Sequence, residues 1–135
     1  MEISSKLIET AVNELAKLPG IGKRTALRFV LHILRQEPRY AEALAQSLTR
    51  VRTEIKFCRV CYCLSDNDIC EICSNPNRDN SLLCVVENIR DMMAIESTSQ
   101  YKGLFHVLGG LISPLEGIGP EKIKIAELIS RINQN

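Results

Sequence analysis

The apolar residues of the first 55 positions recur at the spacing of α-helices. Residues 4–17 place apolar side chains on one helical face, and Ser4 or Ser5 can cap the start of that helix. A second such pattern spans about 23–35, and a third spans about 39–55. The apolar positions of these helices are Leu7, Ile8, Ala11, Val12 and Leu15, then Ala26, Leu27, Val30, Leu31 and Leu34, then Leu44, Leu48, Val51 and Ile55. The pattern predicts an all-helical N-terminal part.

The second half of the chain alternates strand and helix patterns. A short apolar run at 81–86 is typical of a fully buried parallel strand, and a helical pattern follows at about 89–97. A second strand is predicted at 103–108 and a glycine-rich loop at 109–120. A last helix is predicted at 121–133, with inward positions Ile125, Leu128, Ile129 and Ile132. This order predicts an α/β sheet, and because two strands make a poor sheet, we expect the domain to be truncated at its C-terminus.

A segment reading Leu-Pro-Gly-Ile-Gly separates the first two helices. Proline and two glycines cannot extend a helix but permit a tight turn, so the segment matches a helix-hairpin-helix. Gly20 and Gly22 let backbone N–H groups approach a phosphate, and the second helix points its N-terminal dipole there. Lys23, Arg24 and Arg28 add positive charge to the first two turns of that helix. We therefore predict that these five residues bind DNA without reading its sequence.

Two other interpretations of this hairpin stay open. It could be an ordinary turn between helices whose glycines only permit tight packing, or it could pack against another subunit. The charge distribution favours nucleic acid weakly, since the chain up to Val60 has 11 basic and 6 acidic residues, whereas the rest has 6 basic and 10 acidic. The basic residues Arg52, Lys56 and Arg59 could instead offset the charge of a metal site.

Four cysteines form two Cys-x-x-Cys pairs separated by eight residues: Cys58 with Cys61, and Cys70 with Cys73. Each pair can place two sulfurs on one metal, and four thiolates satisfy tetrahedral Zn²⁺. Because the protein fills all four positions, we predict one structural zinc per chain rather than a catalytic one. A redox pair or two disulfides are the alternatives.

Two further cysteines are left out of this predicted site. Cys63 follows the first pair and could compete with Cys61, but Cys-x-Cys chelation is less usual than the two regular pairs. Cys84 lies inside the predicted strand and fits a small buried hydrophobe.

The N-terminus lacks the basic start and apolar run of a secretory signal, and the longest apolar stretches are far shorter than a bilayer requires. We therefore expect no membrane association and a cytoplasmic protein.

The motifs and their order resemble the RecR family of bacterial recombination-repair proteins over essentially the whole chain. The residues that carry the resemblance are Leu18-Pro19-Gly20-Ile21-Gly22, Cys58-Arg59-Val60-Cys61, Cys70-Glu71-Ile72-Cys73, Arg78-Asp79, Cys84-Val85-Val86-Glu87, His106-Val107-Leu108-Gly109-Gly110 and Ser113-Pro114-Leu115-Glu116-Gly117-Ile118-Gly119-Pro120.

The resemblance implies an α+β multidomain fold. It divides the chain into a helix-hairpin-helix domain at 1–56, a four-cysteine zinc finger at 57–76 and a partial α/β Toprim domain at 80–135. It also implies a ring-like tetramer for the full-length family, for which we expect a dimer or less from this fragment. The implied partners are DNA, RecO and RecF, with which the protein would load the recombinase at gapped or damaged DNA and associate with the nucleoid.

Glu87 matches the glutamate that Toprim topoisomerases and primases use near catalytic magnesium, so a magnesium-dependent nuclease or primase fragment is the alternative function. Such chemistry needs further acidic ligands, and an Asp-x-Asp element would fall on a later strand. In the family that the sequence resembles, this glutamate is associated with partner binding. We therefore assign Glu87 to partner binding, predict no catalytic residue, and interpret Asp91 as a solvated helix residue.

Overall fold

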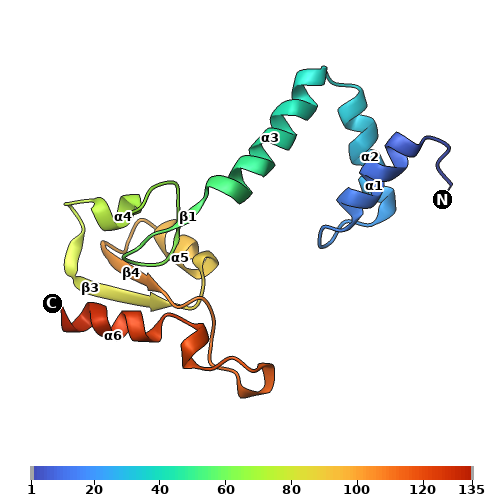
Figure 1. The fold of residues 1–135 in the computed structure, drawn as a ribbon. Coiled ribbons are helices and arrows are strands. Elements are labelled where there is room, and N and C mark those ends of the chain that lie inside the picture. Colours follow the sequence, from blue (N-terminus) through green and yellow to red (C-terminus); the bar gives the residue numbers. More distant parts are fainter. Residues whose placement is uncertain (1, 135) are drawn as a thin grey trace. The chain divides into compact units, whose positions relative to one another are not determined.

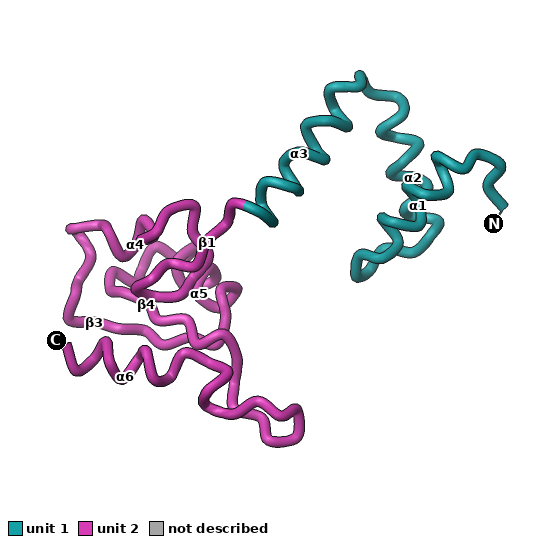
Figure 2. Tube along the Cα trace, viewed as in Figure 1, with its two compact units in different colours: residues 1–53 teal, residues 54–135 magenta. Residues whose placement is uncertain are grey.

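The computed structural model describes residues 2–134. The chain divides into two compact units, residues 1–53 and residues 54–135 (Figure 2), and each is described here by itself. The first unit is helical and the second combines helices with two small sheets (Figure 1). The fold class is therefore α+β and multidomain, as predicted.

The first unit begins with two sequential helices that pack on each other, α1 (Lys6–Ala16) and α2 (Lys23–Leu34). The Ser5 side chain accepts a hydrogen bond from the backbone N–H of Ile8 and so caps α1, as its sequence position predicts. The core between the two helices consists of buried Val12, Ala26 and Val30, surrounded by the partly buried Ile3, Ile8, Ala11, Leu15, Ala16, Ile21 and Leu27. Ile21 thereby anchors the hairpin to the helical core.

Helix α3 (Pro38–Glu54) follows, but its apolar stripe is not part of this core. Leu44, Leu48 and Val51 expose 42%, 61% and 63% of their surface, and none of the helix residues is buried. The apolar face lies where the sequence predicts it, but the described residues of this unit do not cover it. The physical reason is that α1 and α2 close their core on one another, which leaves the α3 stripe without cover in this unit.

The second unit starts with a hairpin, in which β1 (Lys56–Phe57) pairs antiparallel with β2 (Leu64–Ser65), followed by the short helix α4 (Glu71–Ser74). The sequence from Cys58 to Cys73 shows no helical or strand period, because elements of two to four residues are too short to show one.

The larger sheet pairs β3 (Asp79–Val86) with β4 (Gly103–Val107) in parallel, and α5 (Ile89–Glu96) connects them. The strand–helix–strand order is as predicted. The prediction of full burial for the first strand is wrong, however, since Leu82 and Val85 expose 48% and 43% of their surface. Among the described residues β4 is the only partner of β3, so part of that strand stays open.

The predicted glycine-rich loop contains two 3₁₀ turns, η1 (Pro114–Glu116) and η2 (Pro120–Lys122), before helix α6 (Ile125–Asn133). The helix therefore begins four residues later than predicted, because Pro120 starts a separate turn. Two of its expected inward residues, Ile129 and Ile132, are exposed, whereas Ile123 just before the helix is buried.

The core of the second unit joins the cysteine segment to the sheet. Its buried members are Cys58, Cys61, Cys63, Cys70, Val86, Met92, Phe105 and Val107. The backbone N–H of Val107 donates to the carbonyl of Cys61 at 2.8 Å, which ties β4 directly to the cysteines. None of the described helices has both the length and the apolar character needed to cross a membrane.

Candidate zinc centre and nucleic-acid interface

The structure brings Cys58, Cys61, Cys70 and Cys73 together, with their four sulfurs within 4.8 Å of one another. The sulfurs of Cys61 and Cys70 lie 3.6 Å apart, which is far beyond a disulfide bond of about 2.05 Å. Tetrahedral zinc with metal–sulfur bonds of about 2.3 Å requires sulfur–sulfur edges of about 3.8 Å. The four residues fit a structural zinc ion, and they leave no coordination position for an activated water.

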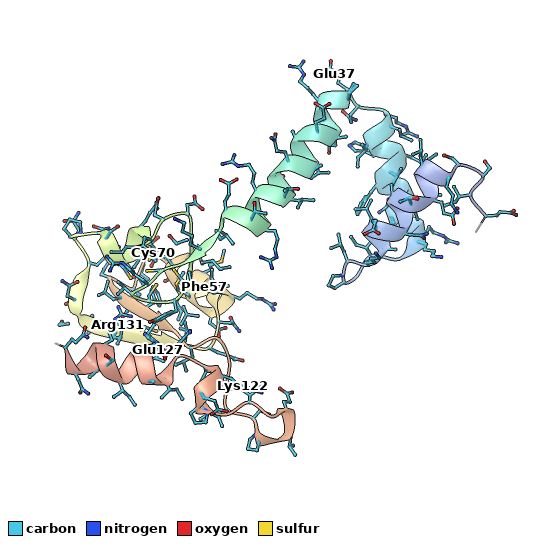
Figure 3. The ribbon with its side chains drawn as sticks, viewed as in Figure 1. Glu37, Phe57, Cys70, Lys122, Glu127 and Arg131 are labelled. Atoms are coloured by element: carbon cyan, nitrogen blue, oxygen red, sulfur yellow. The ribbon has the colours of Figure 1, made fainter. Side chains whose placement is uncertain are left out.

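The local backbone explains how each cysteine reaches the site. Cys58 and Cys61 lie in the turn that follows β1, while Cys70 caps α4 and Cys73 lies within that helix (Figure 3 labels Cys70). The backbone N–H of Cys70 donates to the Cys58 sulfur at 3.3 Å, and that of Cys73 donates to the Cys70 sulfur at 3.4 Å. Such N–H groups favour the thiolate form that zinc requires.

The sulfurs also influence one another's ionisation. Hydrogen bonding with Cys61 holds the pKa of Cys70 well below its usual range. Hydrogen bonding with Cys63 lowers the pKa of Cys61 to about 7. The same hydrogen bonding with Cys61 raises the pKa of Cys73, so the protons are shared unequally among the four sulfurs.

The two cysteines left out of the predicted site lie outside the four-sulfur group. Cys84 is half-buried on β3 and packs against the core, so it is less buried than predicted. Cys63 is buried next to the ligands. Arg59, one of the cations that could offset the charge of the zinc thiolates, pairs instead with Asp68, with Nε 2.9 Å from the carboxylate.

The hairpin between α1 and α2 has two glycines with different roles. Gly20 has a φ of +81°, a conformation that glycine adopts easily and other residues rarely adopt. Gly22 has an ordinary φ of −85° and caps α2, and a methyl group at either glycine would meet open space. The conformation explains Gly20, whereas Gly22 is not required by conformation or by internal packing.

The N-terminus of α2 combines the positive end of the helix dipole with three basic side chains. No side chain caps this helix terminus, so its first backbone N–H groups remain open to a ligand. Lys23, Arg24 and Arg28 are exposed on the first turns of α2, and none of the three is in an ion pair within the described residues. The structure thus places Gly20 and Gly22 in the turn before α2 and the three predicted cations on the first two turns of that helix.

Glu87 lies at the carboxyl end of β3, where its carbonyl accepts a hydrogen bond from the N–H of Gly109 at 2.8 Å. Asn88 caps α5 by accepting from the N–H of Asp91, and the Asp91 side chain is exposed, in line with its interpretation as a solvated helix residue. Within residues 2–134 the cysteine group is the only set of three or more potential ligand side chains close enough to share a metal.

Sequence reasoning assigned no role to His106 and Arg131, which meet in the core of the second unit. His106 is fully buried, with Nε2 2.9 Å from the carbonyl of Lys124. Arg131 reaches from α6 toward the sheet (Figure 3) and donates to the carbonyl of Phe105 at 2.6 Å and toward Nδ1 of His106 at 3.3 Å. The two residues are 25 positions apart, so no local pattern could reveal the contact.

Three family models match the chain. The RecR helix-hairpin-helix model matches residues 8–52, the RecR four-cysteine zinc finger domain model matches residues 55–75, and a Toprim domain model matches residues 81–134.

Curated relatives named "Recombination protein RecR" match nearly the whole chain. The relative from Amoebophilus asiaticus is 57% identical over 134 residues, which is 99% of this chain and 67% of that protein. The relative from Flavobacterium johnsoniae is 57% identical over 98% of this chain and 64% of its own length. The relative from Bacteroides thetaiotaomicron is 53% identical over 96% of this chain and 63% of its own length. The chain thus spans about two thirds of the length of these relatives. At this identity and coverage, the chain belongs to the RecR family of recombination proteins.

Proposed function

We propose that this protein is a non-catalytic DNA-binding component of recombinational repair that contacts DNA phosphates through the hairpin between α1 and α2. The observation that carries the proposal is the N-terminus of α2, which no side chain caps, with exposed Lys23, Arg24 and Arg28 beside it. Gly22 supports it, because the absence of a side chain there keeps the N–H groups accessible. The names of the relatives support a role in recombination.

The binding should not depend on base sequence. Backbone amides and cations contact phosphates and sugars, which are the same at every step of the duplex, whereas sequence is read at base edges. Neutralising phosphates releases counterions, so the affinity should fall steeply as salt rises.

The proposal extends to the rest of the RecR assembly. The zinc centre holds the cysteine segment against β4, and Glu87 lies on a surface for a partner protein. We propose RecO and RecF as the partners with which the family loads the recombinase at gapped or damaged DNA, in the cytoplasm and at the nucleoid. We also propose the domain division 1–56, 57–76 and 80–135, and a ring-like tetramer for the full-length family, with a dimer or less for this chain.

A magnesium-dependent Toprim nuclease or primase is the alternative. It would need several carboxylates around Glu87, and within the described residues no such cluster surrounds it.

The test is a fluorescence titration of labelled DNA with the full chain and with a Lys23→Glu, Arg24→Glu double variant. If each cation contacts one phosphate, the variant should bind much more weakly and the slope of log affinity against log salt should fall by about 2. Arg35→Glu with Arg39→Glu is the matched control, since it makes the same charge change at and just beyond the other end of α2. Equal affinity of the first variant and the parent, or equal losses in both variants, would reject the hairpin as the DNA site.

A further inference from the structure

A cleft of about 500 Å³ opens within the second unit between the cysteine segment and α6. This volume is typical of sites for small ligands. Arg59 and Tyr62 line it from the cysteine segment, and Glu127, Ser130, Arg131 and Gln134 line it from α6 and its C-cap. The cleft contains none of the four zinc ligands and none of the five predicted DNA-binding residues. It is therefore separate from both sites described above.

One nitrogen of the Arg131 guanidinium has no hydrogen-bond partner among the described residues (Figure 3 labels Arg131). Nη1 donates to the carbonyl of Phe105 and toward Nδ1 of His106, whereas Nη2 is buried and unpaired. A guanidinium stays charged in proteins, and a buried donor without an acceptor is destabilising. Nη2 therefore requires an acceptor from outside the described residues.

His106 holds this guanidinium in place. Nε2 of His106 lies 2.9 Å from the carbonyl of Lys124, and because a carbonyl can only accept, Nε2 carries the ring proton. Nδ1 is then free to accept from Nη1 of Arg131 at 3.3 Å. The imidazole is fully buried, so it fixes the direction of the guanidinium. A ligand that binds Arg131 does not have to order this side chain first.

Positive charge predominates around the cleft. Arg59 pairs with Asp68, but the two side chains are 66% and 73% exposed, so the pair is weak and Arg59 can turn toward a ligand. Glu127 is the one carboxylate that lines the cleft, and its Oε2 lies 3.7 Å from Nζ of Lys124. The carboxylate thus pairs with Lys124 rather than with Arg131. The remaining lining groups favour an anion.

The backbone holds Tyr62 against this cleft in an unusual conformation. Its φ of +66° is rare for a bulky residue, and its ring packs edge-on against His106, with 5.6 Å between the ring centroids. Nζ of Lys124 lies 5.2 Å from the centroid of the same ring. Residues in sparsely populated backbone conformations cluster at ligand sites, so the conformation of Tyr62 adds to the evidence for a ligand here.

We propose that this cleft binds a terminal phosphate group, with one phosphate oxygen on Nη2 of Arg131 and with Ser130 and Arg59 available to the others. A phosphate monoester offers nearly two negative charges and three strong acceptor oxygens at neutral pH, whereas a carboxylate offers one charge and two oxygens. The group is either inorganic phosphate or the phosphorylated end of a DNA strand. The second source rests on the DNA-binding function proposed above.

The competing interpretation is that ordered water alone fills the cleft and accepts from Nη2, as water does at other buried polar groups. The two interpretations differ in the effect of phosphate. A hydrated cleft gains nothing from phosphate beyond its ionic strength. A binding site is stabilised in a saturable way, because the ligand binds the folded state and not the unfolded chain.

The experiment titrates the full chain with inorganic phosphate by isothermal calorimetry and by thermal unfolding, with KCl adjusted to hold the ionic strength constant. We expect one saturable site per chain. Arg131→Gln should bind phosphate at least about tenfold more weakly, the scale of one hydrogen bond between charged groups. Glu127→Gln should bind about two- to fivefold more tightly, because it removes a repelling charge. A gain in affinity cannot arise from misfolding.

Glu116→Gln is the matched control, because it makes the same charge change at an exposed residue that does not line the cleft. It should leave the phosphate affinity unchanged. The Lys23→Glu, Arg24→Glu variant should also bind phosphate as the parent does, so failure of the hairpin as the DNA site and failure of this cleft are seen separately.

Competition with single-stranded oligonucleotides in the hairpin variant distinguishes the two sources. If DNA ends are the source, an oligonucleotide with a 5′-phosphate should displace inorganic phosphate, and the same oligonucleotide with a 5′-hydroxyl should not. If neither displaces it while phosphate binds at one site, the source is free phosphate.

An absence of saturable phosphate binding to the parent chain would overturn the proposal. Unchanged phosphate affinity in folded Arg131→Gln would overturn it as well. If Arg131→Gln does not fold, Glu127→Gln decides, and an affinity equal to that of Glu116→Gln would place any bound phosphate elsewhere and reject the cleft.

Discussion

The guanidinium of Arg78 forms a bidentate ion pair with the carboxylate of Glu96, with nitrogen–oxygen distances of 3.0 and 2.9 Å. Its Nε donates to the carbonyl of Gly103 at 2.9 Å. Arg78 directly precedes β3, Glu96 is the last residue of α5, and Gly103 is the first of β4. One side chain, only 10% exposed, thereby joins the ends of three elements that build the sheet.

This geometry predicts that Arg78→Lys destabilises the second unit even though it keeps the charge. Lysine lacks the planar fork, so it cannot make the paired bonds to Glu96 together with the bond to Gly103. We expect a loss of about 2–3 kcal/mol in the free energy of unfolding, which is the scale of hydrogen bonds to charged groups. The partial exposure of Glu96 keeps the loss from being larger. Urea unfolding measures it.

Arg90→Lys is the matched control for this prediction, because Arg90 is exposed on α5. It should change the unfolding midpoint little. If Arg78→Lys and Arg90→Lys shift the midpoint equally, the three-element connection contributes nothing to stability.

The cysteines and the hairpin could be predicted from sequence because each is local. Two residues separate Cys58 from Cys61, and Gly20 and Gly22 lie within one turn, so spacing alone indicates a shared metal site and a tight turn. The ion pair of Arg78 spans 18 positions and requires that α5 already lies beside the sheet. Local spacing carries no information on such a contact.

The amphipathic patterns predicted where the helices lie more reliably than they predicted which residues are buried. The apolar stripe of α3 was found at its correct place, but a stripe indicates only that a helix has an apolar face, not what covers it. Ile129 was expected inside and is exposed within its unit. The burial of His106 was not predicted, because a polar side chain is buried only where other elements supply its hydrogen-bond partners. The sequence does not show those partners.

We predict that acid destabilises the second unit through His106. Burial, with a smaller contribution from the Arg131 guanidinium, lowers the pKa of His106 below its ordinary value of 6.5, and the hydrogen bond with the Lys124 carbonyl only partly opposes this. The folded state therefore binds fewer protons than the unfolded state in the window between the lowered pKa and 6.5. Stability is complete above that window and falls as the pH decreases through it.

His106→Gln should flatten this dependence, because an amide can still donate to the Lys124 carbonyl but does not titrate in this range. Urea unfolding from about pH 7.5 to about pH 5 measures the effect, with zinc content followed in the same samples to separate metal release. His32→Gln, at an exposed position on α2, is the control and should leave the dependence unchanged. A dependence that persists in His106→Gln would assign the acid sensitivity to other groups.

The two hairpin glycines should separate stability from DNA binding. At Gly20 a side chain is opposed by the positive φ, so Gly20→Ala should destabilise the first unit by about 1–2 kcal/mol. At Gly22 the backbone tolerates any residue and space is open, and serine is among the best residues for capping a helix. Gly22→Ser should therefore keep or slightly raise stability.

The same Gly22→Ser change should weaken DNA binding, because the serine hydroxyl would accept the N–H groups of α2 that the phosphate needs and its Cβ would obstruct the approach. Thermal unfolding and DNA titration on both variants measure the two effects. Gly20→Ala provides the comparison, because this variant should lose DNA binding only where it unfolds. At a temperature where it is fully folded, it should bind DNA as the parent does. If Gly22→Ser binds DNA as tightly as the parent, the start of α2 does not contact phosphate, and the glycines serve only the turn.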